Sequence, residues 1–218
     1  MNNDEMVLRI RNDKSIRLEF KENGENRTKI ISVDTLIECV KNSLSGFQVN
    51  TGILPANTLS VTVDTDKAQR YVTMEFPDET ATVTYMQTEY PDFPLPRLLF
   101  GFRLEDSDRI SGVNMGVPDL GKFTPDTRMF CYPFSNVSRF SLCLGANPLP
   151  HIQSVRQLSN LPYHILSFPD NDDRYTERNN QLKLGHRDLM EHLRDKDRNY
   201  YYEHVLVPMP NTTLKDFI

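Results

Sequence analysis

One short segment of the sequence carries two side chains suited to acyl-transfer chemistry. Cys143 stands between two leucines and is followed by a glycine, and Asn136 lies seven positions before it. A cysteine thiolate is a nucleophile that forms a reactive thioester without a metal or a cofactor. A nearby amide can donate a hydrogen bond to the oxyanion formed when an amine attacks such a thioester. On these residues alone, a buried structural cysteine remains the alternative interpretation.

The other candidate reactive residues give weaker signals. Cys39 lies beside the apolar stripe of a predicted helix, and Cys131 lies in a predicted strand, so both are interpreted as structural thiols. None of the five histidines stands in a tight pair with a cysteine or another histidine, so we predict no metal site. The sequence contains no phosphate-binding loop, nucleotide fingerprint or serine nucleophile elbow, and we predict no cofactor.

Size and charge narrow the class of protein. The 218 residues suit one large domain, or one domain with an added lobe, and the three cysteines make a poor disulfide framework. The net charge of −5, without a basic stripe, argues against nucleic-acid binding. The chain has no apolar run long enough for a membrane span and no signal-peptide pattern at its start. We therefore expect a cytoplasmic protein with reduced thiols and no membrane association.

The order of apolar patterns predicts an α+β protein, because strands and helices are largely segregated along the chain. Residues 1–57 are expected to form a strand-rich N-terminal extension packed on a core of residues 58–218. The acidic run Asp170–Asp173 is interpreted as a solvated loop. The expected elements are strands within 6–33, a helix at 34–44, a loop at 47–57, strands at 58–63, 71–76 and 80–86, an extended proline-rich stretch at 90–96 leading into a strand at 97–104, a loop near 112–121, a strand at 127–132, an irregular segment from 146 to about 178, a helix at 180–195 and a docked tail.

Several of these segments resemble ubiquitin-conjugating (E2) enzymes. Those enzymes carry a Tyr-Pro and proline-rich stretch before a strand, which looks like Tyr90–Pro96 followed by the strand at 97–104. Their His-Pro-Asn segment looks like Phe134-Ser-Asn136, with phenylalanine in place of the histidine. Their nucleophilic Cys-Leu looks like Cys143-Leu144.

The chain is more similar still to a prokaryotic E2-like family typified by protein B of the PRTRC plasmid system. The landmarks follow the family order over most of the chain. They are Gly52–Pro55, Leu95–Phe100, Thr127–Phe130, Pro133–Val137, Leu142–Gly145, Leu206–Pro208 and Thr213–Asp216. The resemblance implies a ubiquitin-conjugating-type fold, with an antiparallel meander sheet backed by helices.

The resemblance also implies a function. In such systems a ThiF-type, E1-like adenylating enzyme activates a ubiquitin-like protein, and a JAB-type protease often accompanies them. By resemblance, Cys143 carries the modifier as a thioester, Asn136 supports the oxyanion and His164 is a possible base. Two alternatives stay open: a catalytically inactive E2-fold scaffold of a mobile-element system, and an unrelated α+β protein of a plasmid or phage.

Overall fold

The computed structural model describes residues 6–11, 15–22, 24–44, 50–105 and 109–218. Contacts divide the chain into two compact units, residues 1–50 and 51–218. The second unit thus begins before residue 58, where the sequence patterns put the boundary. The physical reason is that residues 54–57 are already tied to its sheet, since the Glu75 amide donates to the Asn57 carbonyl at 3.0 Å and the Thr58 amide donates to Pro55. Packing of the first unit on the second stays a prediction.

The first unit is a small antiparallel sheet followed by one helix. Its strands are β1 (Val7–Ile10), β2 (Ile16–Glu22) and β3 (Glu25–Ile31), in the order β1-β2-β3, and its helix is α1 (Val33–Leu44). The Ser32 side chain accepts from the Thr35 amide and caps the helix. Ile16 of β2 is buried. Cys39 of α1 is exposed, so the interpretation of Cys39 as a structural, packed thiol was wrong. So short a unit has too few apolar side chains to enclose every helix position.

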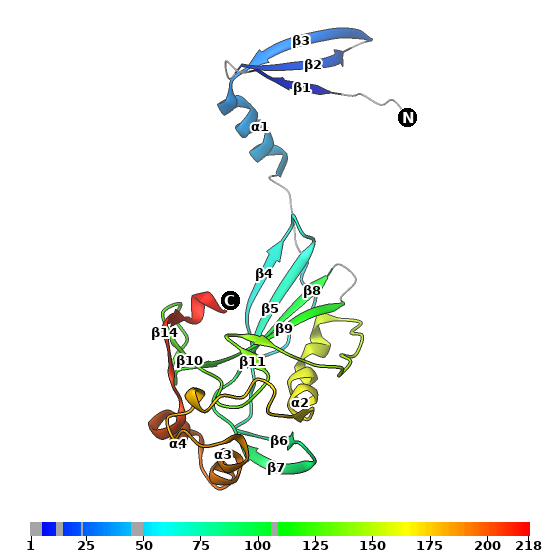
Figure 1. Ribbon diagram of the computed structural model, residues 1–218. Helices are drawn as coiled ribbons and strands as arrows, with labels where there is room; N and C mark the ends of the chain where they lie inside the picture. The colour runs from blue at the N-terminus through cyan, green and yellow to red at the C-terminus, as the bar shows by residue number, and fades with distance from the viewer. Residues whose placement is uncertain (1–5, 12–14, 23, 45–49, 106–108) are drawn as a thin grey trace. The chain divides into compact units, whose positions relative to one another are not determined.

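The main sheet of the second unit is built on four neighbouring antiparallel strands (Figure 1). They are β4 (Thr58–Asp64), β5 (Gln69–Glu75), β8 (Leu99–Glu105) and β9 (Ile110–Pro118). A two-residue hairpin, β11 (Val137–Ser138) and β12 (Ser141–Leu142), extends the sheet beyond β9. Ser141 pairs there with Asn114 of β9. This pairing fixes the hairpin that leads into Cys143.

The chain segment between β5 and β8 forms most of a second sheet. This sheet consists of the hairpin β6 (Thr80–Tyr85) and β7 (Thr88–Pro94), with β13 (Pro169–Asp170) parallel to β6. On the far side of β9, β10 (Arg128–Phe130) pairs with both β9 and the tail strand β14 (Pro208–Thr213). The tail therefore docks on the body, as expected, and the Phe217 ring meets Phe140 edge to face at 5.0 Å.

Short helical segments cover one face of the main sheet. They are η1 (Val155–Asn160), α2 (Leu161–Leu166), η2 (Glu177–Asn179), α3 (His186–Leu193), α4 (Arg198–Tyr200) and η3 (Tyr201–Val205). The last segment, η4 (Leu214–Asp216), instead packs in a second apolar cluster with Leu99, on the opposite face of β8 from Phe100. Buried side chains of η1, α2 and α3 belong to the same apolar cluster as Val72, Phe100 and Phe102 of the sheet. The protein is thus a mixed α+β protein with mostly antiparallel, curled sheets and few helices. Of the described helices, none has the length and apolar character to cross a membrane.

The structure corrects four of the predicted elements. The expected loop near 112–121 is mostly strand β9, whose alternation is masked by two glycines. The proline-rich stretch is mostly strand β7, which pairs only with β6 and so tolerates Pro91 and Pro94 at a sheet edge. The helix expected at 180–195 begins only at His186, because residues 177–184 form a 3₁₀ turn and a loop. The segment expected to be irregular contains α2.

Candidate functional site

The hairpin β11–β12 brings Asn136 and Cys143 together. Asn136 lies just before β11 and Cys143 just after β12, so the two flank the open end of the hairpin. The Cys143 amide donates a hydrogen bond of 2.7 Å to the Asn136 carbonyl. Asn136 has φ of 62°, in the left-handed region that asparagine tolerates better than most residues. The seven positions that separate Asn136 from Cys143 are therefore the number needed to form one tight hairpin between them.

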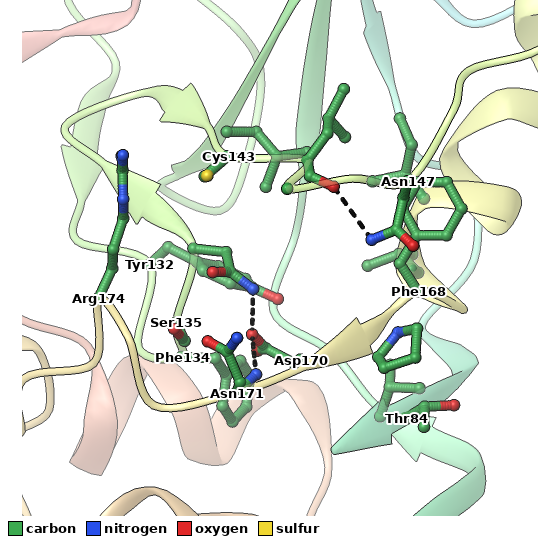
Figure 2. A pocket seen from close by; sticks show the side chains of 18 of the residues that line it. Thr84, Tyr132, Phe134, Ser135, Cys143, Asn147, Phe168, Asp170, Asn171 and Arg174 are labelled. Atoms are coloured by element: carbon green, nitrogen blue, oxygen red, sulfur yellow. Dashed lines mark hydrogen bonds between the residues drawn. The ribbon is translucent and has the colours of Figure 1, made fainter. Parts of the chain in front are cut away.

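Both side chains line a cavity of about 320 Å³ (Figure 2). Its apolar wall comes from the β6–β7 hairpin, α2 and the segment after β10. Its polar lining comes mostly from the segments 135–147 and 170–174, with Thr84 of β6 added. Those two segments contribute Ser135, Asn136, Cys143, Asn147, Asp170, Asn171, Asp173 and Arg174. In the view of Figure 2 the Cys143 sulfur lies above and Asp170 below. A volume of this order suits a few residues of extended peptide or a small molecule, not a folded domain.

Cys143 and Cys131 differ although each directly follows a short strand. Cys143 is half-buried and lines the cavity. Cys131 is also half-buried, but its amide donates to the Val207 carbonyl, and it is not among the described residues that line the cavity. Burial raises the pKa of the Cys131 thiol, which lowers its thiolate fraction. The structure thus places Cys143 on the cavity, whereas the backbone of Cys131 is bonded to the segment that leads into the tail.

Asn136 is oriented by a carboxyl group that sequence patterns assigned to solvent. Its Nδ2 donates to Asp170 Oδ1 at 2.5 Å, and the Asn171 amide donates to the same oxygen at 2.9 Å. Parallel pairing of β13 with β6 draws Asp170 away from solvent, so its interpretation as part of a solvated loop was wrong. Burial raises the pKa of Asp170 to about 6, against the opposing effect of the Asn171 and Ser135 amides.

A buried histidine lies behind Asp170. His186, the first residue of α3, has a side chain only 1% exposed, and its Nε2 lies 3.7 Å from Asp170 Oδ2. Its Nδ1 lies 3.0 Å from Asp172 Oδ1. His186 falls within the segment 180–195, where the apolar pattern predicted a helix, and the sequence assigned it no role. The available signal was a titratable residue at a position whose helical neighbours are all apolar, which is uncommon unless the residue has partners.

The other two expected features have definite places. His164 is exposed on α2, and its ring meets Phe168 edge to face at 4.7 Å. Phe168 lines the cavity, whereas His164 is not among the described lining residues. Phe134, which stands where E2 enzymes carry histidine, is 3% exposed and packs edge to face on Phe93 at 5.8 Å. It therefore forms part of the apolar wall.

The assembled group has the parts needed for acyl transfer: a thiol, an amide that can donate to an oxyanion, and a carboxyl group of raised pKa beside that amide. Among the described side chains, no group of three or more His, Cys, Asp or Glu is placed to hold a metal ion. Comparison with protein-family models, with curated proteins and with solved structures found no match to this chain.

Proposed function

We propose that the protein is an E2-like carrier, which holds a ubiquitin-like protein as a thioester on Cys143 and passes it to an amine. The observation that carries the proposal is the shared cavity, because Cys143 and Asn136 both line it and are joined by a backbone hydrogen bond. A buried structural cysteine has no need of a cavity or of an amide held beside it.

The chemistry follows from these groups. The Cys143 thiolate attacks the carbonyl carbon of an activated C-terminus, the previous carrier thiol leaves, and a thioester forms. An amine then attacks the same carbon, and the Cys143 sulfur leaves as a thiolate while the amine loses a proton. Each step passes through an oxyanion. The Asn136 amide nitrogen carries two hydrogens, and the bond to Asp170 uses one of them, so the other can donate to the oxyanion.

The fold supports the proposal in outline. Four antiparallel strands lie side by side with helical segments on one face, and the cysteine segment follows the last of them in the chain. A ubiquitin-conjugating-type fold and membership of the PRTRC protein B-like family are proposed on this arrangement together with the ordered sequence landmarks. The inserted β6–β7 hairpin is an elaboration of the simple meander.

The proposed partners follow from the proposed chemistry. An adenylating enzyme of the ThiF type would supply the activated modifier, and a JAB-type protease would remove it. The reaction needs no nucleic acid and no membrane surface, and we place it in the cytoplasm.

A catalytically inactive scaffold of the same fold is the second candidate. Two observations favour it: an apolar Phe134 stands in place of the family histidine, and the amide of Asn136 already donates to Asp170. In this form the cavity would bind the modifier's extended C-terminus without forming a bond to the sulfur.

A peptide thioester tests the proposal without knowledge of the partners. A synthetic peptide ending in two glycines, activated as a 2-mercaptoethanesulfonate thioester, is mixed with the protein in a Cys39→Ser background, which removes the exposed thiol of the first unit, and run on a non-reducing gel. We expect an adduct that thiol reagents reverse, that is lost in Cys143→Ser and that persists in Cys131→Ser. Peptide binding without any adduct on Cys143 would select the scaffold. An adduct of equal yield in Cys143→Ser would refute the carrier role.

A further inference from the structure

Behind the proposed acyl site, three side chains form a continuous line from the cavity to the surface. Asp170 lines the cavity and its side chain is 23% exposed. His186 is sealed, with 1% exposure, and Asp172 is 54% exposed. The imidazole has one nitrogen facing each carboxyl group, at 3.7 Å and 3.0 Å. A buried histidine thus lies between two more accessible carboxyl groups. Because imidazole can both gain and lose a proton, this arrangement is suited to a proton relay.

The hydrogen bonds fix which nitrogen of His186 carries the proton. An ionised carboxylate can only accept, so Nδ1 of His186 must donate to Asp172 Oδ1. Asp172 also accepts from the Tyr85 hydroxyl, at 3.0 Å. In a neutral imidazole Nε2 is then an acceptor, and it is a buried atom without a hydrogen-bond partner. Nε2 faces Asp170 Oδ2, which is also an acceptor when the carboxyl group is ionised. One proton placed between these two acceptor atoms would therefore be shared by them.

The ring of His186 is held in place by aromatic neighbours. It stacks on Tyr175 with ring centres 4.5 Å apart and planes inclined by 1°, and it lies 4.3 Å from the Tyr85 ring. The Arg187 guanidinium lies over the Tyr85 ring, 4.9 Å from its centre. The titratable groups around the imidazole are therefore Asp170, Asp172, Tyr85, Tyr175 and Arg187, from three segments of the chain. Burial lowers the pKa of His186, so the ring is neutral at pH 7 and free to accept.

We propose that His186 relays protons from Asp170 in the cavity to Asp172 at the surface. The inference rests on the proposed function, since it assigns the fate of the proton that the attacking amine loses. That proton passes to an Asp170 carboxylate oxygen and then to Nε2 of His186. The hydrogen on Nδ1 moves to Asp172 and from there to water. Between turnovers Nδ1 regains a proton from water through Asp172 and Nε2 returns its proton through Asp170 to water in the cavity, which restores the resting tautomer. His186 acts through Asp170, so it is a positioning and relay residue and does not itself touch the acyl group.

Matched variants test the relay. His186→Asn retains a donor toward Asp172 and removes the atom that faces Asp170, whereas Asp172→Asn interrupts the outer end. His192→Asn, an exposed histidine of the same helix, is the control. With the peptide thioester loaded on Cys143 and free lysine as acceptor, we expect discharge to fall about 10-fold in the first two variants and to be unchanged in the control. Loading itself should be retained.

Chemical rescue separates a relay from a purely structural role. Imidazole buffer should restore discharge in His186→Asn as its concentration rises, because a small base can replace the lost acceptor, while the wild type stays indifferent to the buffer. A variant that is slow at every buffer concentration, or one that discharges at the wild-type rate, would overturn the relay and leave the carrier role intact.

A second measurement decides the relay even if no thioester forms. Nitrogen-15 NMR of the histidine rings in the wild-type protein should show His186 with its hydrogen on Nδ1 and a bare Nε2 above pH 7. An Nε2-protonated ring would contradict the relay. Failure to load the peptide, by contrast, would contradict only the proposed function.

Discussion

Cys131 and Cys143 have the same local position, directly after a short strand, but different surroundings in the folded protein. Each follows a short strand, and both are half-buried. Yet β10 is paired with the tail strand β14 and the Cys131 amide donates to the Val207 carbonyl, whereas Cys143 follows β12 and lines the cavity. We therefore predict that the two thiols differ in reactivity because of what covers the residues after each strand, and not because of their apolar sequence neighbours.

Removing the amide beside Cys143 should have the largest effect. Asn136→Gly keeps the positive φ, which alanine would strain, and keeps the carbonyl that accepts from Cys143. Loss of the oxyanion donor should slow transfer from loaded Cys143 to free lysine about 100-fold. Single-turnover gel assays measure this rate.

Asn147 provides the matched control. Its side chain also lines the cavity, but it donates to the Leu144 carbonyl at 3.0 Å. Asn147→Ala should change transfer less than Asn136→Gly. Equal losses in the two variants would show that Asn136 has no special role.

On the Cys131 side, Tyr202→Phe should weaken the packing of η3 against β10. The Tyr202 hydroxyl donates to the Pro118 carbonyl at 2.8 Å and accepts from the Arg97 amide, and its ring meets Phe130 at 5.6 Å. Leaving two backbone groups unpaired should cost about 2 kcal/mol in unfolding free energy, measured with urea. Tyr200→Phe, which removes a hydroxyl that bonds only to the exposed side chain of His192 among the described contacts, is the control and should cost less. An unchanged unfolding free energy in Tyr202→Phe would mean that the packing of η3 against β10 does not depend on this hydroxyl.

Asp170 gives the cavity side a pH dependence of stability in the acidic range. Its pKa rises from an ordinary 3.8 to about 6 on folding, so the folded protein binds this proton more tightly and loses stability as the pH rises between those values. Asp170→Asn keeps an acceptor oxygen and removes the charge. Above pH 6 it should therefore be more stable than the wild type by about 1 kcal/mol, after allowance for solvent screening.

The pH series supplies its own control. The difference between the two proteins should vanish near pH 4, where Asp170 is protonated in the folded wild type. The depressed pKa of His186 makes stability rise with pH in both proteins, so it largely cancels in the difference. A difference that stays constant from pH 4 to pH 8 would contradict the assignment of the buried charge to Asp170.

The smallest effect is expected at Cys131 itself. Cys131→Ser retains the backbone bond to Val207 and replaces a half-buried sulfur with a hydroxyl, so it should cost less than about 1 kcal/mol. Thioester loading should stay within twofold of the wild type. Loss of loading in this variant would reverse the roles of the two cysteines.

Local patterns predicted the strands with clean alternation, such as β4 and β5, and the capped helix α1, because each carries its own periodicity. They also singled out Asn136 and Cys143. They did not find β9, where glycines interrupt the alternation, nor Asp170 and His186. Those two residues meet through the pairing of β13 with β6 and the packing of α3, which are contacts between segments far apart in the sequence.

Alkylation of the folded protein tests the accessibility of the proposed nucleophile most directly. In a Cys39→Ser background, which removes the exposed thiol of the first unit, iodoacetamide labelling is followed by peptide mass spectrometry. The cavity position predicts that Cys143 is modified at least 10-fold faster than Cys131, whose pKa is raised by burial. Cys143 that resists labelling until the protein unfolds would contradict the account and leave the carrier proposal without its nucleophile.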